Sequence, residues 1–359
     1  MIAFTADNHI GITSQWSIKE RGNDFMRAFH DMVSSIKVHA KSNQNKDGVA
    51  LLIGGDLFDT PYPPSFAVEF VQYEVSRLTK DGCSVFGIDG NHDIAEGRWL
   101  TVCGIGQLSE NPVDVCGRKV CGLSYRRSAD ILSKIKLMAD MGVKCDILVL
   151  HLALGELNRM GAASDIAASE IMTQLKAIGV KLVLIGHIHI RQSVTIDGIT
   201  FAYCGSTEMC SMNEPKEKSF EIIDENTLAI DKCPVATRKI ESFVISTEEE
   251  FAKFESEVDR DMDSLKSVFV TQNIKDGVKR LRNLAEEHGH MMRVQVMRTE
   301  SEEEEHKIDR TTGVIGLEQA IGLSFSPDSD EAGLIRAILR APAAMKVTVD
   351  EFMGGGNDA

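Results

Sequence analysis

Residues 84–93 read SVFGIDGNHD, and this stretch decides the fold because an apolar run ends abruptly in an amide, an imidazole and a carboxylate. The run is about as long as a buried strand. Burying the polar groups of Asn91, His92 and Asp93 together costs free energy unless something binds them. The stretch therefore predicts a strand that delivers ligand-type side chains to a site.

The same pattern occurs at four other places. Apolar runs end in polar residues in IAFTAD (2–7), VALLIGGD (49–56), ILVLH (147–151) and KLVLIGHIH (181–189). Between these runs, apolar residues recur at the spacing of a helix in four stretches. The first runs from Phe25 to Ile36, with Asn23 as a possible N-terminal cap. The others follow Pro63-Pro64, follow Ser128, and end at Gly179. Strands that alternate with helices predict an α/β layered domain, in which ligands collect beyond the carboxyl ends of the strands.

Length and composition limit the class of protein. A chain of 359 residues suits one large domain with a smaller second unit. It contains no apolar run near the roughly 20 residues of a membrane helix, and the N-terminus shows no export signal, so we expect a cytoplasmic protein without a membrane partner. The eight cysteines form no CxxC pair and are expected to be reduced, mostly buried thiols; core packing is favoured over metal binding for Cys116 and Cys121.

The net charge of −15 argues against binding nucleic acid by bulk electrostatics, which usually needs a basic surface. Two features weaken this objection. Bound metal cancels the charge of acidic ligands, and a partner can supply basic surface.

The character of the sequence changes after residue 235. We predict a first domain over 1–235, a smaller α+β domain over 236–310, and a C-terminal segment over 311–359. Short strand candidates (238–246 and 291–298) alternate with charged helical stretches in the second domain. In the last segment Leu334, Ile335, Ile338 and Leu339 share one face of a short helix, which docks a partner or packs on its own domain.

The polar groups at the strand ends form a donor set with oxygen and imidazole ligands and no sulfur, which suits Mn, Fe, Mg or Zn. Seven or eight donors exceed the needs of one ion but match two ions that share a bridging carboxylate, the arrangement that hydrolyses phosphoesters. Each motif alone occurs by chance, whereas all five in this order favour a metal centre. The set is Asp7, His9, Asp56, Asn91, His92, His151, His187 and His189.

These motifs resemble those of the calcineurin-like metallophosphoesterases over roughly residues 1–235. The resemblance implies two mixed sheets packed face to face with helices outside, an αββα sandwich. It also implies that Asp7, His9, Asp56 and His189 hold one metal, and that Asp56, as the bridge, holds the second with Asn91, His151 and His187. His92 would act on the leaving oxygen, and Asp93 would orient the loop or the imidazole of His92.

The segment GGDLFDTPYPPSFA lacks the Arg-Gly typical of serine/threonine phosphatases of this superfamily. Together with ADNHIG, YCGSTEM and KSFEIID it resembles the SbcD family of DNA-repair nucleases, although Asn8 stands where that family commonly has an aromatic residue. This resemblance implies an exonuclease/endonuclease with two divalent ions, Mn above all, and a capping domain that guides DNA.

Partners follow from the same resemblance. It implies a homodimer and a tail helix that binds an SbcC-like ABC ATPase. The segment RWLTVCGIGQL (98–108) is a candidate dimer contact, with ordinary core packing as the alternative. No GxxxxGK[ST] motif occurs in the sequence, so any ATP use belongs to such a partner. Two alternatives stay open: a phosphodiesterase for small substrates such as cyclic nucleotides, and a non-catalytic binding scaffold.

Overall fold

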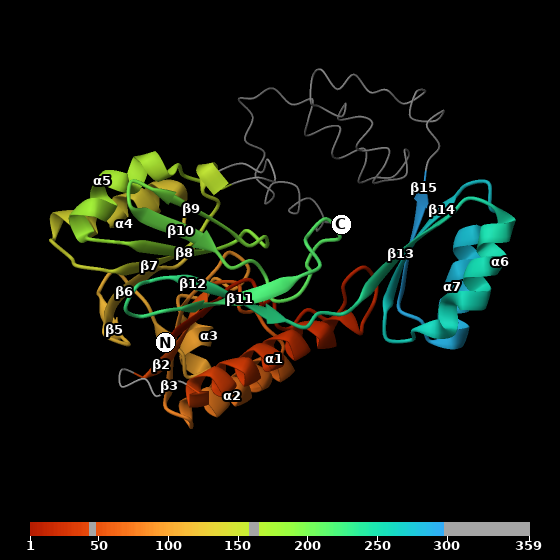
Figure 1. The fold of residues 1–359 in the computed structure, drawn as a ribbon, viewed down its shortest axis with the longest axis horizontal. Helices are drawn as coiled ribbons and strands as arrows, with labels where there is room; N and C mark the ends of the chain where they lie inside the picture. Colours follow the sequence, from red (N-terminus) through yellow and green to blue (C-terminus); the bar gives the residue numbers. More distant parts are fainter. Residues whose placement is uncertain (43–47, 158–164, 298–359) are drawn as a thin grey trace, which may run out of the picture. The chain divides into compact units, whose positions relative to one another are not determined.

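The computed structural model describes residues 1–42, 48–157 and 165–297 (Figure 1). A first compact unit comprises residues 1–270 and 274–295, and a second comprises 271–273 and 296–359, most of which is outside the described residues. No helix in the described ranges is long and apolar enough to cross a membrane. The helices are α1 (Arg21–Ser42), α2 (Ser65–Thr79), α3 (Arg98–Val102), α4 (Ser128–Asp140), α5 (Ala168–Ile178), α6 (Glu248–Glu257) and α7 (Gly277–His288), with 3₁₀ turns η1 (Gly155–Leu157) and η2 (Val258–Arg260).

Two six-stranded sheets form the main body. The first has the order β12-β11-β1-β2-β3-β4 and the second the order β5-β6-β7-β8-β10-β9. Their strands are β1 (Ile2–Thr5), β2 (Val49–Gly54), β3 (Cys83–Ile88), β4 (Gly106–Gln107), β5 (Val113–Val115), β6 (Arg118–Leu123), β7 (Ile147–His151), β8 (Leu182–Gly186), β9 (Gln192–Ile196), β10 (Ile199–Tyr203), β11 (Lys218–Ile223) and β12 (Ile230–Val235). The five predicted strands are therefore confirmed as β1, β2, β3, β7 and β8.

Buried side chains divide the main body into layers. Phe4, Leu52, Val149 and Leu184 belong to the core between the two sheets. A second core joins the outer face of β2 to α1 and α2, and a third joins β7 and β8 to α4 and α5, so that each helix pair covers the outer face of one sheet (Figure 1). Alternating strand faces place apolar side chains on both sides of each sheet. The predicted αββα sandwich is confirmed.

Helix ends mostly follow the predicted signals. Pro64, with an extended ψ of 151°, precedes α2, and Gly179 ends α5 with φ of 90°, which favours glycine. The predicted cap at Asn23 is wrong, because α1 begins at Arg21 and Asn23 lies inside its first turn. The helical turn starts before Asn23 because the N–H groups of Gly22 and Asn23 donate to the carbonyls of Lys19 and Glu20.

A buried ion network fixes the start of α1. The side chain of Arg21 is fully buried, and its guanidinium donates to Asp24 Oδ2 at 2.8 Å, to Glu208 Oε1 at 3.2 Å and to the carbonyl of Met209 at 2.8 Å. Arg238 Nε donates to the same Asp24 oxygen at 2.6 Å. The network therefore joins α1 to the 206–209 loop and to the segment that follows β12. Because a buried charge is costly without partners, each member depends on the others.

A third sheet, β13-β14-β15, comprises β13 (Ile240–Ile245), β14 (Leu265–Thr271) and β15 (Met292–Met297). Phe251, Phe254, Val268 and Leu281 form a separate core between this sheet and α6 and α7. The predicted strands 238–246 and 291–298 correspond to β13 and β15, whereas β14 was not predicted. The division at residues 235/236 stays a prediction, and the C-terminal segment with its predicted helix face lies outside the described residues.

The structure shows where the eight cysteines lie. None of the eight, all of which lie in the described residues, forms a disulfide, and five are buried: Cys83, Cys103, Cys121, Cys145 and Cys204. Burial raises the pKa of the Cys83 and Cys103 thiols to about 12, so these thiols stay neutral in the core. The prediction that most of the thiols are buried is confirmed, and their reduced state stays a prediction.

Replacing Tyr203 by Phe tests the core beneath β7. The buried Tyr203 hydroxyl accepts from the N–H of Leu154 at 2.8 Å and donates to the carbonyl of Leu152 at 2.9 Å. Its loss leaves two buried backbone groups unpaired, so we expect Tyr203→Phe to lower the free energy of unfolding by about 1–3 kcal/mol. Urea denaturation measures the change, with Tyr73→Phe on an exposed position as the control. Equal stability of the two variants would contradict the role given to the hydroxyl.

Candidate metal centre

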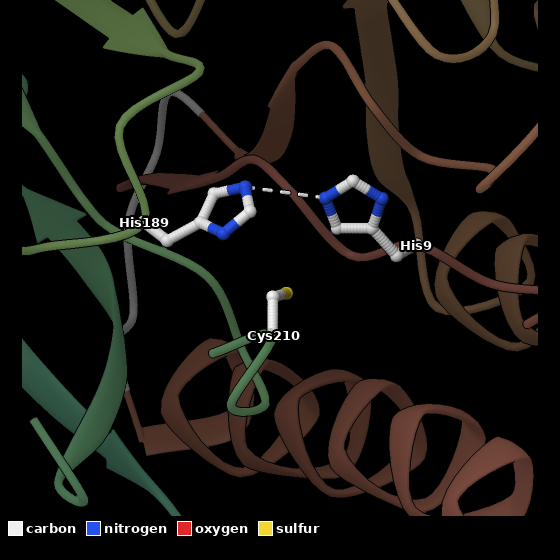
Figure 2. A group of neighbouring side chains, drawn as sticks. All are labelled: His9, His189 and Cys210. Carbon is white, nitrogen blue, oxygen red and sulfur yellow. Dashed lines mark hydrogen bonds between the residues drawn. The ribbon is translucent and has the colours of Figure 1, made fainter. Parts of the chain in front are cut away.

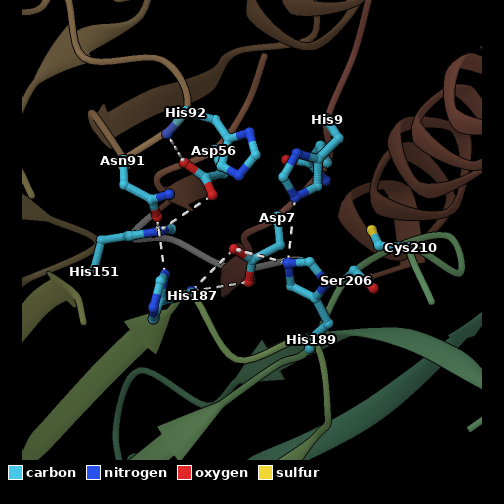
Figure 3. A network of polar contacts seen from close by, with 12 residues as sticks. Asp7, His9, Asp56, Asn91, His92, His151, His187, His189, Ser206 and Cys210 are labelled. Carbon is cyan, nitrogen blue, oxygen red and sulfur yellow. Dashed lines mark hydrogen bonds and ion pairs between the residues drawn. The ribbon is translucent and has the colours of Figure 1, made fainter. Parts of the chain in front are cut away.

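The strand ends place the candidate ligands together. Asp7 and His9 follow β1, Asp56 follows β2, Asn91 follows β3, His151 ends β7, and His187 and His189 follow β8. Because β1, β2 and β3 run parallel in one sheet and β7 and β8 run parallel in the other, their carboxyl ends meet at one edge of the sandwich. The structure brings all seven side chains into one polar network (Figure 3).

Four of these residues hold a strained backbone. Asp7, His9, Asp56 and His187 have φ of 54°, 48°, 50° and 92°, in the left-handed region that non-glycine residues avoid. Each such residue costs on the order of 1–3 kcal/mol and persists only when its surroundings fix it. Here the His187 N–H donates to Asp7 Oδ1 at 2.9 Å, and the His9 N–H donates to the Asp56 carbonyl at 3.0 Å. Strain gathered at one edge marks a functional site.

One half of the site contains two facing imidazoles. His9 Nε2 and His189 Nε2 lie 3.3 Å apart, and Asp7 Oδ1 is 4.0 Å from His189 Nε2. The other ring nitrogen of His189, Nδ1, is 3.1 Å from Glu214 Oε1. A carboxylate on Nδ1 fixes the tautomer that leaves Nε2 as a lone-pair donor, as in many metal sites. The two Nε2 atoms are thus placed to bind one cation.

The other half is centred on the Asn91 amide oxygen. Asn91 Oδ1 lies 2.9 Å from His151 Nε2 and 2.9 Å from His187 Nδ1, and Asp56 Oδ2 lies 3.3 Å from His151 Nε2. His151 Nδ1 is 2.8 Å from the Gly54 carbonyl, which only accepts, so Nδ1 carries the proton and Nε2 faces the site. Two imidazoles, an amide oxygen and a carboxylate form a second set of oxygen and nitrogen donors.

The electrostatics favour a cation. Burial raises the pKa of Asp56, but the neighbouring His151 and His9 outweigh it and hold the pKa well below its usual range. Burial likewise opposes charge on His151, yet the Asp56 carboxylate raises the pKa of this imidazole to about 9. The site thus draws positive charge to a fully buried ring. A divalent cation would replace that proton, since metal ligands bind deprotonated. The donors therefore fit divalent metal, which these side chains would hold.

Glycine makes room for this packing. A Cβ on Gly90 would lie 2.0 Å from Asp56 Oδ1, and a Cβ on Gly186 would lie 2.7 Å from His151 Nδ1. Both distances are far inside van der Waals contact, so only glycine fits there. The glycines of the GGD, GNHD and GHIH motifs thus serve the close approach of strands and ligands.

His92 and Asp93 lie on the same loop with different surroundings. The His92 N–H donates to Asp56 Oδ1 at 2.8 Å, while its half-exposed ring packs edge-on against His9 with centroids 4.8 Å apart. Asp93 is buried, and its two oxygens accept from the N–H groups of Gly90 at 2.7 Å and Phe58 at 3.1 Å. Burial and the nearby Asp56 charge raise the pKa of Asp93 to about 7. Asp93 therefore braces the loop.

Three further residues around the site were not predicted. Asp59 Oδ1 lies 3.2 Å from His9 Nδ1, and Glu214 both contacts His189 and accepts from Lys218 Nζ at 2.5 Å. Cys210 lies beside His9 and His189, with potential ligand atoms all within 4.8 Å of one another (Figure 2). Asp59 had a signal in the D-x-x-D spacing of GGDLFD, whereas Glu214 and Cys210 lie in an irregular loop without a periodic signal.

Comparison with known proteins gives a family and several relatives. The family model of the calcineurin-like phosphoesterases matches residues 1–191. The chain is 26% identical over 249 residues to the DNA double-strand break repair protein Mre11 of Methanosarcina mazei, covering 67% of this chain and 38% of that protein. It is 26% identical over 239 residues to the Mre11 of Haloferax volcanii, covering 64% of this chain and 50% of that protein. A solved archaeal phosphodiesterase, 12% identical, covers 65% of this chain and 98% of its own with a TM-score of 0.32.

The chain belongs to the calcineurin-like phosphoesterase family, a class that works with divalent metals. The predicted resemblance and the predicted enzyme class, a metal-dependent phosphoesterase, are confirmed at this level. The chain spans between about 38% and 50% of the two Mre11 relatives described above.

Replacing Gly90 by Ala tests the metal centre. For the parent, Mn²⁺ at about 100 times its dissociation constant should stabilise the fold by about 2.7 kcal/mol per site and raise Tm. The added methyl of Gly90→Ala would displace Asp56, so we expect the Mn²⁺-induced rise in Tm to be lost. Differential scanning calorimetry with and without Mn²⁺ measures it.

Gly142→Ala is the matched control. Its φ is 70°, and a Cβ there meets open space, so it bears backbone strain without touching the site. It should keep the full rise in Tm. An equal response to Mn²⁺ in both variants would speak against a metal centre at Asp56.

Proposed function

We propose that this chain is the nuclease subunit of a DNA-repair complex and hydrolyses phosphodiester bonds of DNA with two divalent metal ions, manganese above all. The observation that carries the proposal is the convergence of seven oxygen and nitrogen donors beneath the half-exposed ring of His92. The similarity to Mre11 proteins over 64–67% of this chain supports DNA as the substrate class.

Two cations held by Asp7, His9, Asp56, Asn91, His151, His187 and His189 would polarise the phosphoryl oxygens and lower the pKa of a water molecule. The chain's own residues supply the rest. His92 has its backbone tied to Asp56, and its Nδ1 lies 3.1 Å from the Asp59 carbonyl, which sets the orientation of the ring. Its exposed edge is then free to donate a proton to the leaving oxygen. Asp93 keeps the loop in register by holding the N–H groups of Gly90 and Phe58.

A cavity beside the site supports an anionic polymer as substrate in spite of the acidic chain. It has a volume of about 520 Å³, begins at His189 and is lined by Arg191, Lys216, Lys218 and Lys232. Lys218 is buried against Glu214, and Arg191 pairs with Glu221, so both are held in place. Lys216 donates to a backbone carbonyl and Lys232 pairs with a mostly exposed Glu217, which leaves these two cations available to phosphates. These four side chains place positive charge in the cavity lining, beside Glu217, although the net charge of the chain is −15.

The assembly is proposed on the same resemblance. We infer a homodimer and an SbcC-like ABC ATPase partner that would provide ATP use and further basic surface. The candidate dimer segment 98–108 includes α3, where Val102 is exposed and the indole of Trp99 donates to the Pro61 carbonyl at 2.9 Å. The proposed partner-binding helix lies in 311–359, outside the described residues. A cytoplasmic location stays a prediction.

His92→Ala should abolish cleavage while metal stays bound. Removing a proton donor costs roughly 10²–10⁴-fold in rate, whereas the seven metal ligands are untouched. End-labelled linear and hairpin duplex DNA, digested with and without Mn²⁺, measures the rate, and metal analysis measures occupancy. His30→Ala is the control, since its side chain is 47% exposed against 44% for His92 and lies on α1.

The substrates decide between the alternatives. If the parent hydrolyses a chromogenic diester or a cyclic nucleotide but leaves DNA intact, it is a small-substrate phosphodiesterase, which the acidic composition favours. If it turns over neither substrate with metal bound, it is a binding scaffold. Either result overturns the nuclease proposal.

Lys216→Ala with Lys232→Ala tests the cavity as a path for the DNA backbone. Each phosphate contact contributes about 0.9 to the slope of log affinity against log salt. In a His92→Ala background, fluorescence anisotropy with duplex DNA should show a slope lower by about one per contact removed. Lys119→Ala, on an exposed lysine of β6, is the control and should leave the slope unchanged. An unchanged slope in the double variant would remove the cavity from the DNA path.

A further inference from the structure

A second cluster of potential metal ligands lies in the third sheet region, built from Asp259, His288 and His290. Asp259 lies in η2, which follows α6. His288 is the last residue of α7, and His290 lies two residues before β15. Three separate elements therefore bring one carboxylate and two imidazoles together. None of them takes part in the phosphoesterase centre.

The two imidazoles converge on one oxygen. His290 Nε2 lies 2.8 Å from Asp259 Oδ1, and His288 Nδ1 lies 3.5 Å from the same atom. The two rings are parallel within 3°, with centroids 5.8 Å apart. A carboxylate between two histidines at these distances is the arrangement that three ligands of one cation adopt.

The surroundings of His290 indicate a missing partner. Its side chain is fully buried, yet neither ring nitrogen has a hydrogen-bond partner among the described residues. The 2.8 Å approach of Asp259 is out of line for a hydrogen bond from Nε2, which prefers an angle above about 150°. Two ligands of one cation approach each other off the lone-pair axis in this way, because the ion occupies the axis. A buried ring nitrogen without a partner is otherwise unfavourable.

The positive charge of the neighbouring Lys266 does not prevent a cation from binding at His290. Its ammonium is held by the carbonyl of Asp261 at 2.5 Å and by the hydroxyl of Ser264 at 3.3 Å. Burial and the Lys266 charge lower the pKa of His290, although Asp259 acts in the opposite direction.

We propose that Asp259, His288 and His290 bind a divalent cation of the zinc type. Two imidazole nitrogens and one carboxylate oxygen match the ligands that zinc takes from proteins, with the remaining position open to water because Asp259 and His288 are half exposed. The ion would cross-link η2 to the end of α7 and the start of β15. Its role is to stabilise this part of the fold, independent of the phosphoesterase reaction.

Metal analysis of the full chain tests the proposal. Protein stripped with a chelator is reloaded with Zn²⁺, and zinc is counted by mass spectrometry after gel filtration. The parent should hold one equivalent more than Asp259→Asn or His288→Gln. In a Co²⁺-loaded sample the visible absorption should lose one component in the same variants. Both positions are about half exposed, so neither substitution removes core packing.

His39→Gln, on α1, is the matched control and should keep the parent's zinc content. Mn²⁺-dependent phosphodiesterase activity should be unchanged in Asp259→Asn and His288→Gln, which separates this site from the proposed catalytic centre. Equal zinc content in parent and both variants would overturn the proposal and leave a plain ion pair between histidine and aspartate.

Discussion

The buried carboxylate of Asp56 is the group on which both halves of the site depend. It lies between the imidazole of His151 on one side and that of His9 on the other. It also accepts a hydrogen bond from the backbone N–H of His92 and so holds that loop. An ionised carboxylate with almost no solvent exposure is costly unless positive charge compensates it. The positive φ of Asp56 adds to this cost. The surrounding sandwich supplies the rigidity that keeps so unfavourable a group in place, and a cation would supply the compensation.

Much of the fold and the candidate site could be predicted from five apolar runs, because a buried strand has a local pattern that can be recognised in the sequence. A run such as VALLIGGD fixes the strand, its direction and the residue that emerges at its carboxyl end. Once the strands share a sheet, the side chains after them meet without further information. The glycines beside them carry a second local signal, since a Cβ on Gly90 or Gly186 has no space.

The remainder depends on contacts that no local pattern encodes. Glu214 reaches His189 from an irregular loop 25 residues away, and the start of α1 at Arg21 is set by ion pairs with Glu208, 187 residues later in the chain. Only the assembled fold shows such partners. The strand β14 has a short apolar run between charged segments, and its pairing with β13 and β15 decides its conformation. Cys210 lies next to two candidate ligands although its spacing resembles no metal motif.

The pairing of β1 with β11 has a consequence for synthesis. The first strand of the chain is hydrogen-bonded to β2 on one side and to a strand that begins at Lys218 on the other. A ribosome makes the amino-terminal end first, so one edge of β1 stays unpaired until more than two hundred residues have been translated. An open edge is a template for wrong pairing during that interval. Since Glu214 and Lys218 arrive in the same late segment, the nascent polypeptide pairs the open edge of β1 and gains the support of His189 together.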